Sequence, residues 1–212
     1  MAHVSVAERR PQLIAAAIDL MKREGATAGS TRAVAAELGV AQATVHYVFG
    51  SKEELYRAVI KQLTDNVVSY VSGVEIPASP DFGKSLSFLV QRLWQSLLDE
   101  PDTHLLLTEL SVIALRMPQL RNALEEHRRT VDEVTGSLIE ATAEHAGADL
   151  AASPILLAQF FLAGFDGLTQ QHLAAPDKKS EQWRLDSLVS ATTALALGRL
   201  VPNAAELEGE PS

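Results

Sequence analysis

Residues 42–52 bring together side chains that form hydrogen bonds to anions and to the edges of nucleic-acid bases. Gln42, Thr44, His46 and Tyr47 lie within six residues of one another, and Lys52 follows shortly after them. Amide, hydroxyl, imidazole and phenol groups can donate to phosphate oxygens, and an amide can also bond a base edge. The sequence shows no nucleophile elbow, phosphate loop or histidine-glutamate metal helix. The residue types therefore indicate recognition of a polyanion.

The other titratable residues form no catalytic or metal-binding pattern. None of the six histidines, at positions 3, 46, 104, 127, 145 and 172, has another histidine one helical turn away, as a metal pair on a helix would. Glu125 and Glu126 are adjacent, so their carboxylates diverge on a helix. The chain has no cysteine, which excludes disulfides and thiolate ligands. The sequence predicts neither an enzyme nor a metal site, and it implies no cofactor.

The charge of the chain is unevenly distributed. Residues 1–61 carry eight Lys and Arg against six Asp and Glu, a balance of +2. The remaining residues carry ten against twenty-one, a balance of −11 that brings the whole chain to −9. A slightly basic N-terminal segment on an acidic body suggests that the N-terminal segment approaches phosphates.

The composition is that of a globular chain with a sizeable core, because 47% of the 212 residues are hydrophobic. The N-terminal residues lack the continuous apolar region of a signal peptide. The longest apolar run, residues 155–165, is too short to span a bilayer. We therefore expect a cytoplasmic protein without a membrane partner.

Helical periodicity runs through the whole sequence, and no segment alternates as a strand would. The pattern predicts an all-α fold of about nine helices, with an N-terminal three-helix helix-turn-helix domain followed by a larger helical domain. The domains are predicted at residues 1–51 and 52–201, with a disordered tail at 202–212. The predicted helices cover residues 8–24, 31–38, 42–49, 52–72, 84–99, 101–116, 118–146, 154–173 and 181–200.

The two short helices 31–38 and 42–49, joined through Gly39, have the pattern of a helix-turn-helix. In the second, apolar residues Val45, Val48 and Phe49 fall on one side, while Ala43, His46 and Tyr47 fall on the other. A helix of this length is stable only when it packs against its neighbours. Its outer face is small near its start, so it can enter a major groove end first. The alternatives are an ordinary three-helix subdomain and, for Tyr47 alone, partial burial in the core.

A known DNA-binding segment, that of the TetR family of transcriptional regulators, resembles residues 30–60, STRAVAAELGVAQATVHYVFGSKEELYRAVI. The likeness extends over residues 8–60 and rests on a glycine turn, an aromatic pair, a phenylalanine and a Ser-Lys pair at fixed spacings. Three positions depart from the family pattern, which often has serine at Ala41, tyrosine at His46 and histidine at Val48. Beyond residue 60 the likeness is one of helical architecture.

The resemblance implies a homodimer that binds a double-stranded DNA operator and a small-molecule effector. Typical members repress transcription until the effector binds, and a minority activate it. The residues expected to contact DNA are Ser30, Thr31, Arg32, Gln42, Ala43, Thr44, His46, Tyr47 and Lys52.

The body is expected to hold both the dimer interface and the effector pocket. The last two predicted helices would form half of an intersubunit four-helix bundle, or alternatively a plain hydrophobic hairpin. A mostly apolar effector, oriented by a few polar groups, is expected. The alternative for Trp94 and His127 is a core position. Expected dimer residues are Phe160, Phe161, Gly164, Phe165, Leu168, Leu188, Thr192 and Leu195. Expected effector residues are Trp94, Thr108, Arg116, His127 and Asp166.

A second function remains open from the sequence alone. The predicted recognition helix, residues 42–49, carries no lysine or arginine. A helical effector-binding or interaction protein that has lost its DNA-binding role would also fit that observation. If DNA is bound, Arg32, Lys52 and either Arg9 or Arg10 must supply the attraction to phosphate.

Overall fold

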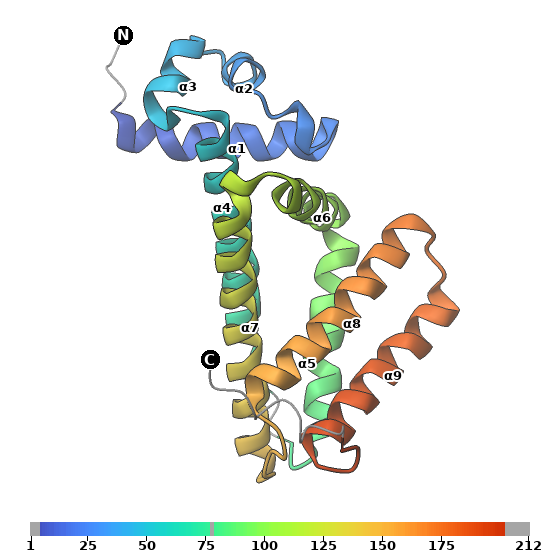
Figure 1. Ribbon diagram of the computed structural model, residues 1–212. Coiled ribbons are helices and arrows are strands. Elements are labelled where there is room, and N and C mark those ends of the chain that lie inside the picture. Colours follow the sequence, from blue (N-terminus) through green and yellow to red (C-terminus); the bar gives the residue numbers. More distant parts are fainter. Residues whose placement is uncertain (1–4, 77–78, 202–212) are drawn as a thin grey trace. The chain divides into compact units, whose positions relative to one another are not determined.

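The computed structural model describes residues 5–76 and 79–201 (Figure 1), and within them it contains α-helices, one short 3₁₀ helix and no strand. The predicted all-α fold is confirmed, while the tail predicted at 202–212 lies outside the described residues. No described helix is long and apolar enough to cross a membrane. The elements are α1 (Val6–Glu24), η1 (Ala26–Ala28), α2 (Thr31–Glu37), α3 (Gln42–Phe49), α4 (Lys52–Ser72), α5 (Phe82–Asp99), α6 (Pro101–Arg116), α7 (Pro118–Ala146), α8 (Pro154–Ala174) and α9 (Lys178–Ala196).

Capping residues decide where the observed helices differ from the predicted ones. The Ser5 hydroxyl and the Glu8 carboxylate form a reciprocal capping box, so α1 starts at Val6 and Pro11 lies inside it. Helix α9 starts at Lys178 because the Asp177 side chain accepts a hydrogen bond from the Lys179 amide. The predicted range 181–200 therefore began too late and ended too late.

The chain divides into two compact units. The first unit combines the segment that ends at Tyr70 with Leu97–Thr130, and the second combines Val71–Ser96 with the segment that begins at Val131. Helices α4, α5 and α7 thus contribute residues to both units. The predicted functional boundary between residues 51 and 52 stays a prediction.

The first unit packs α1, α2 and α3 around a continuous apolar core that also includes α4, α6 and the start of α7. Leu13 of α1, Val34 of α2, Val45 of α3 and Leu55 of α4 are all fully buried in this core. Figure 1 shows α2 and α3 lying together against α1. The core therefore includes one face of each short helix, as a helix-turn-helix requires.

Hydrogen bonds to Ala26 connect three elements of the first unit. The buried Tyr56 hydroxyl of α4 donates to the Ala26 carbonyl over 2.5 Å, and the Ala26 amide donates to the Glu109 carboxylate of α6 over 2.6 Å. Lys22 and Glu100 add an ion pair of 2.8 Å between α1 and the residue before α6. The turn after α1 is consequently held by both α4 and α6.

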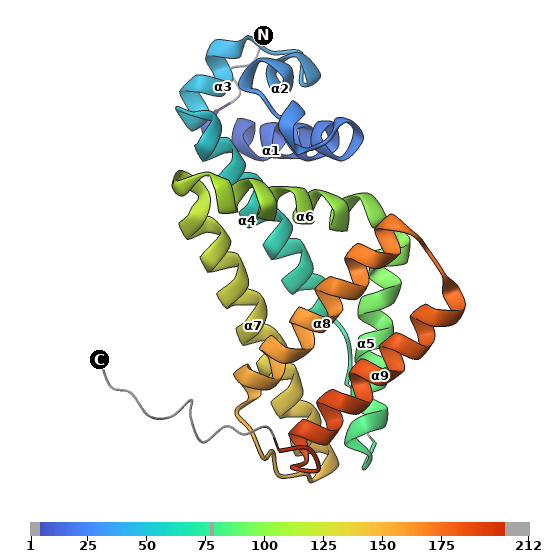
Figure 2. The same cartoon turned by 45° about the vertical axis from the view of Figure 1, so that its right-hand side comes forward.

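The second unit contains the hairpin of α8 and α9, which lie side by side in both views (Figures 1 and 2). A Cβ atom at Gly164 would lie 2.6 Å from Leu188 Cδ1, so glycine permits this close approach of the two helices. Trp94 of α5 packs edge-to-face against Phe165 and His172 of α8, with ring centroids 5.9 and 5.3 Å apart. Aromatic contacts of this geometry stabilise the packing of α5 on the hairpin.

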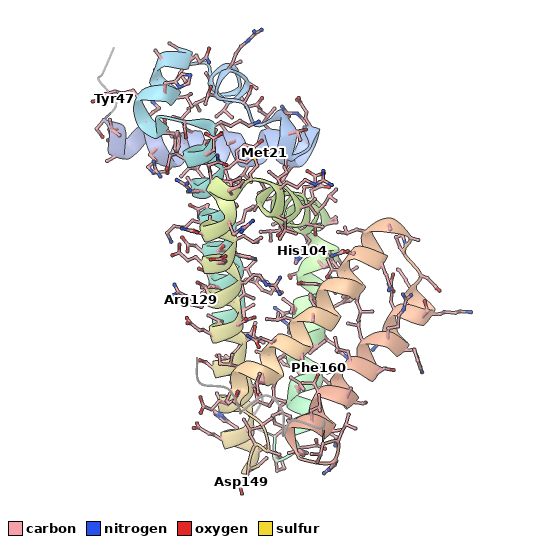
Figure 3. The ribbon with its side chains drawn as sticks, viewed as in Figure 1. Met21, Tyr47, His104, Arg129, Asp149 and Phe160 are labelled. Atoms are coloured by element: carbon pink, nitrogen blue, oxygen red, sulfur yellow. The ribbon has the colours of Figure 1, made fainter. Side chains whose placement is uncertain are left out.

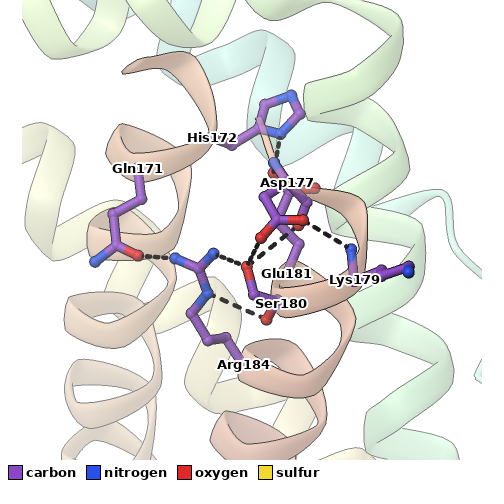
Figure 4. A network of polar contacts seen from close by, with 7 residues as sticks. All are labelled: Gln171, His172, Asp177, Lys179, Ser180, Glu181 and Arg184. Carbon is purple, nitrogen blue, oxygen red and sulfur yellow. Dashed lines mark hydrogen bonds and ion pairs between the residues drawn. The ribbon is translucent and has the colours of Figure 1, made fainter. Parts of the chain in front are cut away.

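The turn of the hairpin is closed by a polar network around a buried carboxylate (Figure 4). Glu181, which is 7% exposed, accepts hydrogen bonds from His172 Nδ1 over 2.9 Å and from the Asp177 amide over 2.7 Å. Arg184 donates to the side-chain oxygen of Gln171 on the other helix. Burial raises the pKa of Glu181, but the hydrogen bonds from His172 and Asp177 outweigh it and hold that pKa below its ordinary value.

Replacing Glu181 by glutamine should make the hairpin less stable at neutral pH. Because the pKa of Glu181 is lower in the folded state, the carboxylate stabilises the fold above about pH 4.5, and this contribution is lost as the pH falls through the folded-state pKa. We expect Glu181→Gln to lose about 1 kcal/mol of unfolding free energy at neutral pH. The variant should also lose less stability than the wild type on further acidification.

Urea denaturation of the full chain at neutral and acidic pH measures both effects. Glu140→Gln, which alters an exposed carboxylate on α7, is the matched control and should behave like the wild type. Equal stability of the Glu181→Gln and wild-type chains, with the same pH dependence, would contradict this account of the network.

Candidate nucleic-acid interface

Helices α2 and α3 are set at their ends by a serine cap and by a glycine turn. The Ser30 hydroxyl accepts a hydrogen bond from the Ala33 amide over 3.1 Å and thereby caps α2. Gly39 has φ +68°, a left-handed conformation that residues with a side chain rarely adopt. Ala41 precedes α3 in an extended conformation and offers no side-chain cap. The first turn of α3 thus leaves its backbone amides without a capping side chain from Ala41.

The two faces of α3 differ sharply in exposure. Val45 and Phe49 are buried, while Ala43, His46 and Tyr47 are exposed. Tyr47 is 79% exposed, so it is not a core residue, and Figure 3 shows it on α3 among the first three helices. The face that the sequence pattern predicted to point outward does so.

Three side chains form a polar cluster where α2 meets the start of α3. Gln42 Nε2 lies 3.3 Å from both Thr31 Oγ1 and His46 Nε2. Thr31 Oγ1 and His46 Nε2 are 3.4 Å apart, and His46 Nδ1 lies 3.5 Å from the Gly50 carbonyl oxygen. Thr31 is largely buried, whereas Gln42 and His46 are exposed. Sequence reasoning placed each residue at the interface but gave no sign that they contact one another.

Positive charge flanks α3 rather than lying on it. Arg32 is exposed and Lys52 is half-buried, and neither forms an ion pair with any residue in 5–76 or 79–201. Lys52 opens α4, with its Nζ 4.9 Å from the centre of the Tyr56 ring. Arg10 lies over the Phe49 ring at 4.7 Å. Arg32 and Lys52 are thus available for anions, and the start of α4 adds a favourable helix dipole.

Ser51 holds Lys52 at this helix start. Its hydroxyl accepts a hydrogen bond from the Glu54 amide over 3.2 Å, as the predicted cap requires. The Glu54 carboxylate forms an ion pair with Arg57, and Arg57 also donates to the Gln119 carbonyl over 2.6 Å. The Glu54 carboxylate, which lies near Lys52 in the sequence, is thus paired with Arg57.

The five residues predicted to bind an effector fall in both compact units. Trp94 is buried and Asp166 exposed in the second unit. In the first unit Arg116 is exposed, and the Thr108 hydroxyl donates to the His104 carbonyl of its own helix over 3.0 Å. His127 Nδ1 lies 2.7 Å from the Thr64 hydroxyl oxygen, a bond between α7 and α4 that suits the structural role considered as its alternative.

One polar group near Trp94 escaped the sequence analysis. Thr169 follows Phe165 by one turn of α8 and precedes His172 by another, so the three share a face. Its hydroxyl oxygen is buried and has no hydrogen-bond partner within the described residues. A hydroxyl on an otherwise apolar helix face gives no signal in the sequence, because threonine usually bonds its own helix backbone.

The residues predicted for the dimer interface separate into an inner and an outer set. Phe161, Phe165 and Thr192 are buried within this one chain, and their place in a dimer interface stays a prediction. Gly164 packs on Leu188 between α8 and α9. Phe160, labelled in Figure 3, is 42% exposed. Of the remaining predicted residues, Leu168 and Leu195 are half-buried.

Two further apolar side chains are exposed on the hairpin and were not predicted. Leu156, one turn before Phe160, is 54% exposed, and Trp183 of α9 is 71% exposed. The spacing of Leu156 and Phe160 could have indicated a common outer face, since residues four apart are neighbours on a helix. Trp183 could have been noticed as a single large apolar residue in a polar segment.

The family model described as bacterial regulatory proteins, tetR family, matches residues 13–59. These residues include α2, the turn and α3, together with most of α1 and the start of α4. The match therefore covers the exposed α3 face, the polar cluster and Lys52.

Known proteins resemble the chain over nearly its full length. The HTH-type nicotine-responsive transcriptional repressor HdnoR of Paenarthrobacter nicotinovorans is 26% identical over 188 residues, which are 89% of this chain and 95% of that protein. The crystal structure of the multidrug binding protein EbrR complexed with imidazole superposes with a TM-score of 0.68 at 27% identity, over 92% of each chain. A putative TetR-family transcriptional regulator from Rhodococcus sp. shares the fold with a TM-score of 0.71 at 21% identity, over 90% of this chain and 99% of that one.

Three observations agree on one assignment. The helix-turn-helix matches the family model, a repressor with a helix-turn-helix is related over most of the chain, and structures of TetR-family regulators share the complete fold. This family consists of DNA-binding regulators and not of enzymes, as the sequence analysis predicted. The chain is similar to the TetR family of transcriptional regulators, whose family model matches its helix-turn-helix segment, residues 13–59.

Proposed function

We propose that the chain is a cytoplasmic repressor that binds a palindromic operator as a homodimer and leaves it when a small, mostly apolar effector binds. The observation that carries this proposal is the exposed polar face of α3, flanked by Arg32 and Lys52, which form no ion pair within residues 5–76 and 79–201. A protein that had lost its DNA-binding role would have no reason to keep this face exposed and these cations free. The related HdnoR, whose name describes a transcriptional repressor, supports repression over activation of transcription.

In this proposal α3 enters the major groove while its flanks bind the phosphate backbone. Gln42 and Thr44 at the start of α3 offer amide and hydroxyl groups to bases, and His46 and Tyr47 offer donors to phosphates. Lys52 binds a phosphate beside the first turn of α4, whose amides favour an anion. Two copies of α3 would meet half-sites about 34 Å apart along the operator.

The second copy of the chain would dock on the hairpin of the second unit. The large apolar side chains exposed on these two helices are Ile155, Leu156 and Phe160 of α8 and Trp183 of α9. Burial of such a patch against its own symmetry mate gives an isologous interface, the usual form in a dimer. The half-buried Leu168 and Leu195 would extend the contact.

The effector is proposed to bind beside the aromatic cluster of the second unit. Trp94, Phe161 and Phe165 are buried and joined by ring contacts, and aromatic rings suit an apolar or aromatic ligand. The unpaired Thr169 hydroxyl would gain a partner from one polar group of that ligand. Relatives described as nicotine-responsive and as a multidrug binding protein support a small organic effector. Thr108, Arg116, His127 and Asp166 remain further candidates for its polar contacts.

The effector would act by favouring a conformation that holds the two α3 helices at the wrong spacing for the operator. A ligand shifts this equilibrium only through its different affinity for the two conformations. Within the first unit the turn after α1 is bonded to Tyr56 of α4 and to Glu109 of α6. A displacement of either helix would therefore reach the helix-turn-helix through a direct hydrogen bond.

Selection of genomic DNA fragments by the purified protein, followed by binding at two salt concentrations, tests the proposed function. We expect a common palindrome whose binding weakens steeply with salt, because phosphate contacts release counterions. Lys52→Ala should weaken binding to every sequence and lower the slope of log affinity against log salt by about one.

Lys84→Ala, which removes an equal charge from the second unit, is the control and should leave the salt slope unchanged. Absence of any DNA binding by the wild type, with and without candidate effectors, would favour the alternative of a protein that has lost its DNA-binding role. Binding to fragments that share no common sequence would show that the protein contacts only the DNA backbone.

Phe160→Glu should separate the dimer. A carboxylate buried in an apolar interface without a partner costs about 3 kcal/mol or more, which is over a hundredfold in the dimer dissociation constant. Sedimentation velocity at micromolar concentration measures the change. Phe88→Glu on α5 is the control, because Phe88 is 41% exposed and Phe160 42%. A dimeric Phe160→Glu chain would place the interface elsewhere.

Trp94 should report effector binding through its fluorescence. The chain has two tryptophans, so Trp183→Phe leaves Trp94 as the single reporter, while Trp94→Phe leaves Trp183 as the control. We expect a compound that releases the operator to change the emission of Trp94 and not that of Trp183. The first probes are nicotine, after the nicotine-responsive HdnoR, and malachite green, which is bound in another EbrR crystal structure. Release of DNA without a change at Trp94 would move the effector site away from the aromatic cluster.

A further inference from the structure

The cluster of Thr31, Gln42 and His46 determines how the amide of Gln42 is oriented. Gln42 opens α3, His46 lies one turn later on the same helix, and Thr31 opens α2. The Gln42 amide nitrogen is the atom shared by the cluster, at 3.3 Å from the Thr31 hydroxyl and 3.3 Å from His46 Nε2. Its position between two fixed neighbours restricts the free rotation that an exposed glutamine normally has.

The contact made by the other ring nitrogen of His46, Nδ1, indicates which groups donate in these hydrogen bonds. The Gly50 carbonyl oxygen, 3.5 Å from His46 Nδ1, can only accept, so this long contact favours the neutral tautomer with the proton on Nδ1. His46 Nε2 is then an acceptor, and Gln42 must present an N–H to it. The second N–H of the amide is directed to the Thr31 hydroxyl. Both amide hydrogens are occupied within the protein.

The Gln42 carbonyl oxygen is left as the group that can meet DNA. It accepts no hydrogen bond from any residue of the described chain, and Gln42 is exposed. A glutamine with a free amide pairs with adenine through two bonds, accepting from the N6 amino group and donating to N7. A glutamine limited to its oxygen can only accept, and the amino groups of adenine and cytosine are the donors in the major groove.

We propose that Thr31 and His46 are positioning residues that restrict Gln42 to reading amino groups, so that adenine and cytosine are accepted alike and guanine and thymine are rejected at one operator position. This inference rests on the proposed DNA-binding function and adds the rule by which one residue discriminates bases. Guanine and thymine present only acceptors at that edge, which would face the Gln42 oxygen without a hydrogen between them.

The experiment measures base preference rather than affinity alone. The operator recovered by the wild-type protein is first retested with Gln42→Ala, which identifies the base pair whose preference is lost. Affinities for the four bases at that pair are then compared among the wild type, the double variant Thr31→Val with His46→Phe, and Gln42→Glu. The full-length protein is used in the same buffer at pH 8 throughout.

The wild type should bind adenine and cytosine within about twofold of each other and guanine and thymine about fivefold or more weakly, the value of one hydrogen bond. The double variant frees the amide nitrogen, so adenine should gain about fivefold over cytosine through the added bond to N7. Gln42→Glu can only accept and should keep the wild-type pattern. Lys52→Ala is the control, because it should weaken all four sites equally.

Two outcomes would overturn the proposal. One is a wild type that already prefers adenine over cytosine by the factor seen in the double variant. The other is a Gln42→Ala chain whose base preferences equal those of the wild type. Failure of the proposed function is distinct from both, because no operator would then be recovered by the wild-type protein at the first step.

Discussion

The structure of the interface depends on one constraint, which is that α3 is too short to be stable by itself. A helix of eight residues forms too few hydrogen bonds to offset the cost of its nucleation. It persists because Val45 and Phe49 are buried in the core of the first unit. The same burial decides which residues remain outside, since a rotation of α3 by one residue would bring His46 inward and expose Val45. Packing therefore sets both the stability of α3 and the identity of the groups it can offer.

The turn at Ala26 extends this constraint to the longer helices. Its carbonyl and its amide are both engaged, by Tyr56 of α4 and by Glu109 of α6. A buried backbone group without a partner is costly, so neither helix can move away from this turn without replacing the lost bond. The first unit thus joins the helix that begins with Lys52 to the helix-turn-helix through polar bonds as well as through the apolar core.

Local sequence signals predicted most of the fold because they act over a few residues. Serine caps at Ser30, Ser51 and Ser153 lie directly before three helices whose predicted starts the structure reproduces to within one residue. Helix α8 is a case in which local signals do not predict which residues are buried. Apolar residues surround it, so periodicity alone could not separate buried Phe161 from exposed Phe160. That distinction depends on the packing of α9 and α5 against α8, which is a property of tertiary structure.

The parts of the site that sequence reasoning missed also depend on distances between elements. The short helix η1 consists of Ala, Thr and Ala, which carry no periodic pattern. The cluster around Gln42 joins residues 11 and 15 positions apart in the chain, and spacing within one helix cannot reveal it. Residue types were sufficient to predict the candidate interface, but only the geometry shows which hydrogen atoms are already in use.

The distribution of charge makes this geometry more important than it would be on a basic recognition helix. The whole chain carries a net charge of −9, and α3 has no lysine or arginine. Sequence-independent affinity for DNA comes mainly from cations that neutralise phosphates, and at this interface those cations are confined to flanking positions such as Arg32 and Lys52. Few phosphate contacts give weak binding to arbitrary DNA. In the proposed function, a larger share of operator affinity then comes from hydrogen bonds to bases, and the direction in which each polar side chain of α3 can donate or accept becomes decisive.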